Sequence, residues 1–151
     1  EHHQSNYGRG LMSNYFAVGL GLIEHLEAKA DEWGVKHIGT VADISKINKQ
    51  ITPALYVINT GNNPNANGSI DSRDVQQWTV VVAVSNQAAQ DDVKALMESS
   101  GELISKVINH VQGYELDDYH DALERTSTSG RPDYFSTFAL YPLTFQTTIT
   151  P

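Results

Sequence analysis

Apolar residues recur at steps of three and four positions in two long segments of the chain, which is the period of one face of an α-helix. The first segment extends from Ser13 to about Trp33, and Ser13 or Asn14 is expected to cap it. The second begins near Asp91 and ends at Gly113, a residue type that commonly follows the last turn of a helix. The pattern therefore predicts two amphipathic helices, each with one face turned towards a core.

Two glycines, Gly19 and Gly21, lie within the first of these helical segments. A phosphate-binding loop would place its glycines after a strand and at the start of a helix. We therefore expect these glycines to permit close packing of the helix rather than to bind phosphate.

Four further segments are rich in β-branched and aromatic residues, as β-strands are. They comprise residues 35–41, 54–59, 74–85 and 131–149. The continuous apolar character of residues 54–59 suits a strand that is buried on both faces, and the loop that joins it to residues 74–85 predicts a β-hairpin. Asp43 is expected to cap a short helical turn between the first two strands.

The last strand contains Pro142, which has no backbone N–H to donate to a neighbouring strand. We expect the strand to break or bulge at this residue, or to lie there at an edge of the sheet. A chain that ends on a long edge with unpaired backbone groups can pair with another chain, so the pattern favours self-assembly. Residues 114–126 show neither period clearly and are expected to be partly strand and partly loop.

The order of these elements predicts an α+β domain with a mixed, mainly antiparallel sheet, two principal helices packed on one side and a long C-terminal strand. A chain of 151 residues, 40% of them hydrophobic, is long enough to bury one core without a metal or a disulfide. Residues 12–151 are therefore expected to form a single domain. Residues 1–11 have no periodicity and precede Met12, and we expect them to be an added or unstructured leader.

The composition argues against several classes of function. The formal charge of -8, from 18 acidic and 10 basic side chains, argues against a nucleic-acid-binding surface, because phosphate contacts need clustered Lys and Arg. The absence of cysteine excludes a disulfide framework, a thiolate nucleophile and a Cys-ligated zinc site. The longest apolar run, residues 79–84, is far shorter than the ~20 residues of a membrane-spanning helix, so no membrane association is expected.

Residues 63–74 place oxygen-bearing side chains at the spacing of a calcium-binding EF-hand loop, with Gly68 at the position that such a loop reserves for glycine. The candidate ligands are Asn63, Asn65, Asn67, Asp71 and Asp74. Asparagine replaces the carboxylates at the first ligand positions, and no helix is predicted before the loop. An exposed Asn- and Gly-rich hairpin loop is therefore expected, and calcium binding is the alternative.

A second candidate site is the acidic segment that contains Asp117, Asp118, His120 and Asp121. These are the residue types that a metal-dependent hydrolase uses. No second histidine lies at metal-ligand spacing, and no nucleophile motif such as Gly-x-Ser-x-Gly accompanies them. A solvated acidic segment is therefore expected, and neither a catalytic residue nor a cofactor is predicted.

Two other histidines are isolated in the sequence. His25 lies on the first predicted helix and His37 on the first predicted strand. A single histidine in such a place is more often a surface or capped residue than a metal ligand, so neither is predicted to bind a metal.

With these elements placed, the sequence resembles the tail terminator (minor tail) proteins of long-tailed bacteriophages and prophages. The resemblance lies in the helix that opens the domain, the Pro-Ala-Leu-Tyr-Val strand at residues 53–57 and the Trp-Thr-Val-Val-Val strand at residues 78–82. It continues in the helix of residues 101–114 and the final segment of residues 131–145. It spans about residues 12–150 and rests on the order and spacing of the elements, not on any one residue.

The resemblance implies a structural protein without catalytic residues. Proteins of this family form a ring, usually a homohexamer, that caps the tail tube at full length, ends tube polymerisation and offers a surface for head-tail joining. The implied partners are copies of this chain, the tail tube protein and the head-side connector protein. The implied location is the virion tail, with assembly in the host cytoplasm. An acidic subunit fits a DNA channel, because a negative wall repels phosphate.

Exposed, irregular segments on a rigid sheet are where recognition usually occurs. We therefore expect partner contacts in the loop of residues 62–73 and in the turn of residues 126–133. The candidate interface residues are Asn62, Asn65, Asn67, Asp71, Arg73, Arg131, Asp133 and Tyr141. The alternative is that both segments are plain solvent-exposed connections.

Three other functions are open at this point. Another neck or tail completion protein of a phage would share these features, and the sequence does not separate it from a tail terminator. A small metal-dependent hydrolase that uses residues 117–121 would lose activity when His120 is changed to Ala. A calcium-responsive binding module that uses the Asn-rich loop would fold in a calcium-dependent way.

Overall fold

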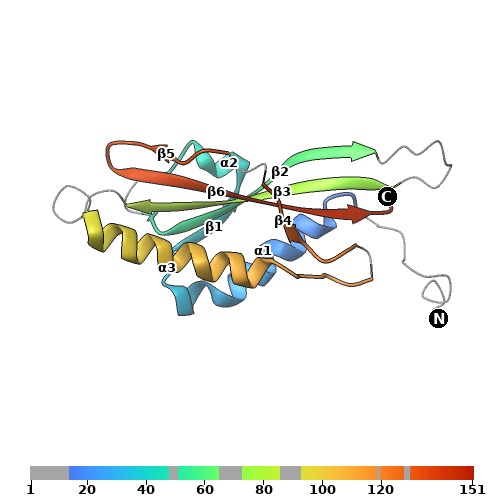
Figure 1. The fold of residues 1–151 in the computed structure, drawn as a ribbon, viewed down its shortest axis with the longest axis horizontal. Coiled ribbons are helices and arrows are strands. Elements are labelled where there is room, and N and C mark those ends of the chain that lie inside the picture. Colours follow the sequence, from blue (N-terminus) through green and yellow to red (C-terminus); the bar gives the residue numbers. More distant parts are fainter. Residues whose placement is uncertain (1–13, 48–50, 65–72, 86–92, 119, 128–129) are drawn as a thin grey trace.

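The structure, a computed structural model, combines helices with one β-sheet (Figure 1). It describes residues 14–47, 51–64, 73–85, 93–118, 120–127 and 130–151. In chain order the elements are α1 (Ala17–Trp33), β1 (His37–Thr40), α2 (Val41–Ile44), β2 (Ala54–Pro64), β3 (Asp74–Ser85), α3 (Val93–Val111), β4 (Glu124–Arg125), β5 (Asp133–Tyr134) and β6 (Phe138–Ile149).

All the strands belong to one sheet, in the order β1-β2-β3-β6-β4, and β5 also pairs with β6. β1 and β2 are parallel, whereas the other pairs are antiparallel. β2 and β3 form the expected hairpin, and β3 pairs with β6 from Asp74 opposite Ile149 to Ser85 opposite Phe138. The prediction of an α+β fold with a mixed, mainly antiparallel sheet and a long C-terminal strand is confirmed.

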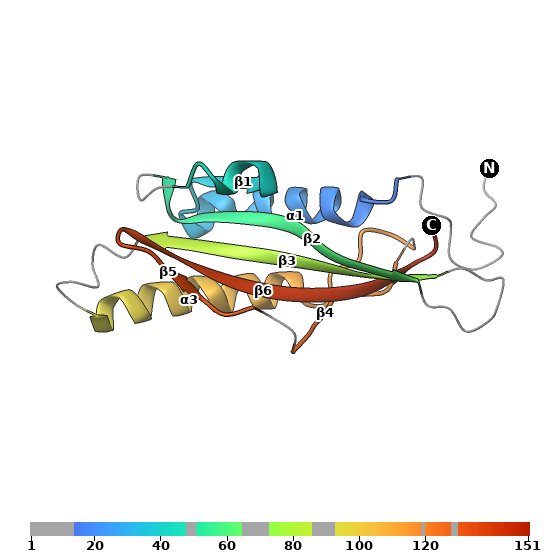
Figure 2. The same cartoon turned by 90° about the horizontal axis from the view of Figure 1, so that it is seen from above.

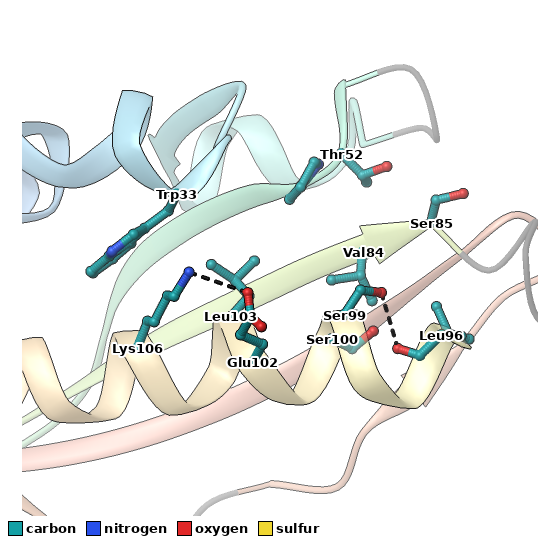
Figure 3. A pocket seen from close by; sticks show the side chains of 11 residues that line it. Trp33, Thr52, Val84, Ser85, Leu96, Ser99, Ser100, Glu102, Leu103 and Lys106 are labelled. Carbon is teal, nitrogen blue, oxygen red and sulfur yellow. Dashed lines mark hydrogen bonds and ion pairs between the residues drawn. The ribbon is translucent and has the colours of Figure 1, made fainter. Parts of the chain in front are cut away.

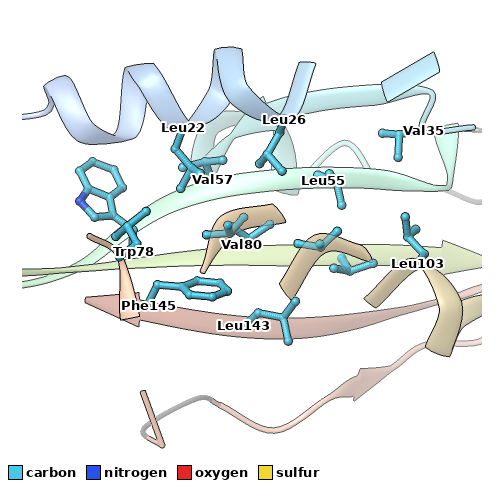
Figure 4. Close-up of a cluster of buried hydrophobic side chains, with 14 of the residues drawn as sticks. Leu22, Leu26, Val35, Leu55, Val57, Trp78, Val80, Leu103, Leu143 and Phe145 are labelled. Carbon is cyan, nitrogen blue, oxygen red and sulfur yellow. The ribbon is translucent and has the colours of Figure 1, made fainter. Parts of the chain in front are cut away.

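α1 and α3 cover the same face of the sheet, α1 along β2 and α3 along β6 (Figures 1 and 2). The core lies between these helices and the strands. The buried side chains labelled in Figure 4 include Leu22 and Leu26 of α1, Leu103 of α3 and Leu55, Val80 and Phe145 of the sheet. Truncating one such buried leucine to alanine costs about 2–5 kcal/mol, so this layer carries much of the stability.

β3 is buried on both faces, because successive side chains of a strand point to opposite sides. Val80 and Val82 face the helices. Val81 and Ala83 face the other side, where they form a smaller buried cluster with Tyr56 of β2. The first four residues of β2 are buried as well, which confirms the prediction of a central strand there.

The start of α1 differs from the predicted capping. The helix begins at Ala17, and Phe16 at its N-cap makes no side-chain capping hydrogen bond. Asn14 accepts, through Oδ1, a 2.8 Å hydrogen bond from the N–H of Phe16, so it closes the turn before the helix instead of capping it. Ser13 lies outside the described residues. The end agrees with prediction, since Gly34 takes the left-handed conformation with φ of 71°.

Asp43 does not cap the short helix α2, contrary to prediction. The N-cap is Thr40, and Asp43 lies at the N3 position, where Oδ2 accepts a 3.1 Å hydrogen bond from the N–H of Thr40. This hydrogen bond is the main reason why the pKa of the Asp43 carboxyl lies below its ordinary value. An acid three residues after a threonine completes a capping box, which explains the misplaced cap. His37, with Nε2 3.7 Å from Asp43 Oδ2, is exposed, as expected.

The last strand is not the free edge of the sheet, contrary to prediction. β3 pairs with one side of β6, while β4 and β5 pair with residues 145–146 and 139–140 on its other side. Pro142 lies opposite Val81 in an unbroken register, so the strand neither breaks nor bulges there. Pro142 lies between the residues that β5 and β4 pair with, so the expectation of a locally unpaired edge holds around that residue.

Gly19 and Gly21 lie on the buried side of α1. A Cβ at Gly19 would overlap the indole of Trp78, and one at Gly21 would crowd Leu116 and Tyr114. The prediction that these glycines permit close packing is therefore confirmed.

Candidate assembly interface

One end of the sheet carries a polar edge, which we call the hairpin arm: residues 58–64 of β2 with the facing part of β3. β1 borders β2 only at residues 54–57, so no strand in the described part of the chain covers the outer side of residues 58–64. A register shift at Asn59 and Gly61 marks a β-bulge, and Asn59 Nδ2 donates to Oδ1 of Asn62 at 3.0 Å. A bulge and exposed amides on an edge oppose indiscriminate strand pairing.

Side-chain hydroxyls hold the base of the hairpin arm. Oγ1 of Thr79 lies 3.0 Å from Oγ1 of Thr60 and 2.8 Å from Oγ1 of Thr144, so β3 is linked to both neighbouring strands. Tyr15, which precedes α1, donates its hydroxyl to Oδ2 of Asp74 at 2.5 Å. Burial and then this hydrogen bond raise the pKa of the Tyr15 hydroxyl. The hairpin arm is therefore held at its base by the threonine hydroxyls and at its far end by Tyr15.

The opposite end of the sheet, where β5 pairs with β6 (Figure 1), carries four aromatic residues that we call the aromatic cluster: Tyr134 and Phe135, which are exposed, and Phe138 and Tyr141, which are half-buried. Phe135 stacks on Phe138 with centroids 4.7 Å apart, and Tyr134 meets Tyr141 edge-on at 5.9 Å. Tyr134 is 68% exposed and Phe135 is 48% exposed. Large exposed aromatic groups are typical of protein–protein contact surfaces.

Tyr141 of the aromatic cluster stays uncharged even above the ordinary tyrosine pKa of about 10. Burial, followed by the hydrogen bond to Tyr134, raises the pKa of Tyr141 to about 12. Arg131 and Asp133 lie in the exposed segment that leads into the cluster. The surface therefore combines uncharged aromatic rings with one side chain of each sign beside them.

A groove of about 360 Å³ lies on the helical face, between the end of α1, the first half of α3 and the ends of β2 and β3 (Figure 3). Trp33 and Leu103 give it apolar walls, and Lys106 and Glu102 form an ion pair of 3.3 Å at its rim. Ser100 lines it too, and within the described part of the chain its buried Oγ has no hydrogen-bond partner. Such a groove can receive an apolar side chain.

The acidic segment combines one buried histidine with exposed aspartates. His120 is 1% exposed, and its Nε2 accepts the N–H of Leu116 at 2.8 Å while its Nδ1 lies 2.6 Å from the carbonyl oxygen of Asp121. Asp117 and Asp118 are exposed. Among the residues that the structure describes, no three His, Asp or Glu side chains are grouped to hold a metal ion. Both ring nitrogens of His120 therefore serve the fold.

The candidate calcium ligands fall only partly within the described residues. Asn63 lies in β2 and Asp74 in β3, at the far end of the hairpin arm. The carboxylate of Asp74 already accepts the hydroxyl of Tyr15. The candidates outside the described residues are Asn65, Asn67 and Asp71.

The predicted interface residues that the structure describes form two groups at opposite ends of the sheet. Asn62 and Arg73 are exposed at the hairpin arm. Arg131, Asp133 and Tyr141 lie in or beside the aromatic cluster. The structure thus separates the candidates into a polar end and an aromatic end.

Sequence reasoning missed the other members of the aromatic cluster. The sequence pattern predicts one continuous strand that contains Tyr134, Phe135 and Phe138. The available signal was the Ser136-Thr137 pair between them, which is a turn signal flanked by aromatic residues.

The fold defines the class as an α+β protein that exposes a polar edge at one end of its sheet and aromatic side chains at the other. No helix in the described ranges is both long and apolar enough to span a membrane. The chain belongs to the phage tail terminator protein family, because the model of that family matches residues 12–151. The resemblance inferred from the sequence is thus confirmed, and the chain is a structural component of a phage tail.

A solved structure of similar fold comes from a virus-like particle, described as "Virion of native gene transfer agent (GTA) particle". The TM-score is 0.58 at 13% sequence identity, over 92% of this chain and 100% of that chain. At this identity the likeness shows a shared fold. No curated protein matches the sequence.

Proposed function

We propose that this chain caps the tail tube as a homohexameric ring, ends tube polymerisation at full length and offers a surface for head-tail joining. The observation that carries the proposal is the family match over residues 12–151. Its partners are then copies of itself, the tail tube protein and the head-side connector protein.

The separation of the two exposed ends supports a ring. Identical subunits close a ring through a heterologous contact, in which one surface of a subunit meets a different surface of the next. The hairpin arm is polar and the aromatic cluster is apolar, so the two ends of the subunit are different surfaces. We assign the subunit contact to the aromatic cluster, because permanent interfaces are the more hydrophobic ones.

The groove on the helical face is the receiving surface in this proposal. It is lined by Trp33 of α1 and Leu103 of α3, whereas the aromatic cluster belongs to β5, β6 and the turn between them (Figure 3). An aromatic side chain such as Phe135 from the next subunit would bury apolar area there. The hairpin arm, with Asn62 and Arg73, is then left for the tail tube or the connector.

The charge of the subunit fits a channel that passes DNA. Each copy carries a formal charge of -8, so a ring wall made of these copies repels phosphate. The same charge opposes assembly, since like-charged subunits repel one another when salt does not screen them. Ring formation is therefore expected to strengthen with salt or with divalent cations.

Growth of tail tubes in vitro tests the proposed function. The tail tube protein of the same phage is allowed to polymerise with and without this protein, and tube lengths are measured by electron microscopy. Capping predicts shorter tubes that carry a ring at one end. Tubes of unchanged length, with this protein bound only to the head-side connector, would favour another neck completion protein instead.

A further inference from the structure

Two histidines from different helices clasp α1 to α3. The rings of His25 and His110 stack with centroids 3.7 Å apart and planes 5° from parallel. Nε2 of His25 lies 2.8 Å from the carbonyl oxygen of His110, and Nε2 of His110 lies 2.9 Å from the carbonyl oxygen of His25. A carbonyl oxygen only accepts, so each Nε2 carries a hydrogen and donates it. The two residues thus exchange hydrogen bonds across the helix pair.

Aromatic rings extend this clasp towards the sheet. Tyr114, which follows α3, stacks on His25 with centroids 4.2 Å apart and also faces His120 at 6.2 Å. Trp33 meets His110 edge-on at 5.3 Å. We call His25, His110, Tyr114 and His120 the histidine array, because their rings form one continuous series.

The hydrogen bonds of His120 require its neutral form. Nε2 accepts from the N–H of Leu116, so Nε2 carries no hydrogen, and Nδ1 donates to the carbonyl oxygen of Asp121. Nδ1 also lies 3.2 Å from Oγ1 of Thr147 on β6. A second proton on Nε2 would remove the acceptor from the N–H of Leu116 and place a charge at a site 1% exposed.

A second proton is also unfavourable on His25. It would go to Nδ1 and put a positive ring 3.7 Å from its neighbour. Burial is the main reason why the pKa of His25 lies below its ordinary value. The carbonyl of His110 acts in the opposite direction, whereas the ring of His110 and the ammonium of Lys29 lower the pKa further.

The remaining charged groups near the array come from two elements. Glu24 of α1 acts on Tyr114, whose pKa is raised first by burial and then by this carboxylate. Asp121 lies beside His120 in the segment between α3 and β4 and has an exposed side chain. On β6, His120 contacts the side chain of Thr147, which does not titrate in the range considered.

We propose that the histidine array is an acid-sensitive latch that ties α1, α3 and residues 114–118 and 120–121 to β6 at neutral pH and loosens when an imidazole takes up a second proton. The segment is fixed to β6 by the bridge of His120 with Ile149 and by the N–H of Asp121, which donates to the carbonyl oxygen of Thr148 at 3.2 Å. Acidification thus frees an exposed acidic segment at the sheet edge. The latch is independent of the proposed ring.

The direction of the pH effect follows from the lowered pKa of His25. The unfolded chain binds the proton more tightly than the folded chain does, so acidification favours unfolding. The stability that His25 contributes is complete above its unfolded pKa of about 6.5 and is lost as the pH falls from there towards the lower pKa of the folded state.

Nitrogen NMR of the unmodified protein tests the latch without a mutation. Long-range ¹H–¹⁵N spectra at about pH 7.5 should show the hydrogen on Nε2 of His25 and His110 and on Nδ1 of His120. As the pH falls, the amide of Leu116 should become less protected from hydrogen exchange, after correction for its intrinsic rate. The loss should reach about tenfold for each unit by which the pKa of the imidazole is lower in the folded state than in the open state. A hydrogen on Nε2 of His120, or protection that does not change below about pH 6.5, would overturn the proposal.

A pair of variants separates the latch from the general effect of acid on carboxylates. His25→Gln keeps a donor at the ε position but does not titrate, so it should lose less of its melting temperature than the wild type between about pH 7.5 and pH 5.5. His37→Gln is the control, because His37 is exposed beside Asp43 and outside the array. It should lose as much as the wild type. Equal losses in all three proteins would refute the latch.

Discussion

Gly19 of α1 lies so close to Trp78 of β3 that a Cβ at Gly19 would overlap the indole ring. The indole cannot easily move aside, because it is 4% exposed and its Nε1 donates to Oε1 of Gln76 at 3.1 Å. The amide of Gln76 in turn donates to the carbonyl oxygen of Tyr15 at 2.8 Å. The missing side chain at Gly19 therefore lets the first helix approach the sheet.

Replacing Gly19 by Ala is expected to destabilise the protein. Alanine favours a helix by about 1 kcal/mol over glycine, but overpacking against a fixed ring costs about 1–3 kcal/mol, so the sum is a loss of up to about 2 kcal/mol. Chemical denaturation measures the change. Gly101→Ala in α3 is the matched control, since a Cβ there has no neighbour within 4 Å and should stabilise by about 0.5–1 kcal/mol. Equal gains in both variants would show that packing does not require Gly19.

Truncating Phe135 to Ala is expected to weaken self-association while leaving the fold intact. The side chain is 48% exposed and stacks on Phe138, so its loss should lower the unfolding free energy by about 1–2 kcal/mol, which is too little to unfold the domain. Met97→Ala is the control, because Met97 is 71% exposed on α3 and lies outside the aromatic cluster. Light scattering at high salt should show smaller particles for the Phe135 variant alone. Smaller particles for both variants, or for neither, would exclude the aromatic cluster as the subunit contact.

Self-association is expected to increase with ionic strength. A formal charge of -8 on each copy makes assembly unfavourable at low salt, and the repulsion is largely screened once the Debye length falls to about 8 Å at physiological ionic strength. Sedimentation velocity from low to high salt measures the mean particle mass. A mass that falls as salt is added would mean that attraction between opposite charges, rather than apolar contact, holds the copies together.

Tyr134→Phe is expected to lower the pKa of Tyr141 from about 12 towards the ordinary value, because it removes the hydroxyl that hydrogen-bonds Tyr141. A pKa that folding raises gives stability below the unfolded pKa of about 10, and this stability is lost as the pH rises towards 12. The wild type should therefore lose more stability than the variant in this range. Ultraviolet titration of the phenolates measures the shift. An unchanged Tyr141 would mean that burial alone sets its pKa.

The long elements could be predicted from sequence because each has a clear period. β3 runs from Asp74 to Ser85, as its β-branched run indicates, and α1 ends before Gly34, as the glycine indicates. The strands β4 and β5 have two residues each and are too short to show a hydrophobic period. The sequence pattern therefore does not predict that they pair along the outer side of β6. For this reason the pattern places the last strand at an edge of the sheet. It does not predict the free edge that the structure shows in β2.

Contacts between distant residues could not be predicted in the same way. His25 and His110 are 85 positions apart, and nothing in their local sequence indicates that their rings stack. His120 was read as a candidate of an acidic cluster because its neighbours are Asp, yet both of its nitrogens bind the backbone. Residue type indicates what chemistry is available, whereas the fold decides whether the groups meet.

Negative-stain electron microscopy of the purified protein at high salt tests the central claim most directly. The account predicts closed rings with a central hole, made of copies of this chain, and predicts that they disappear at low salt. The account would be contradicted if only isolated molecules were seen at every salt concentration, both with and without tail tubes.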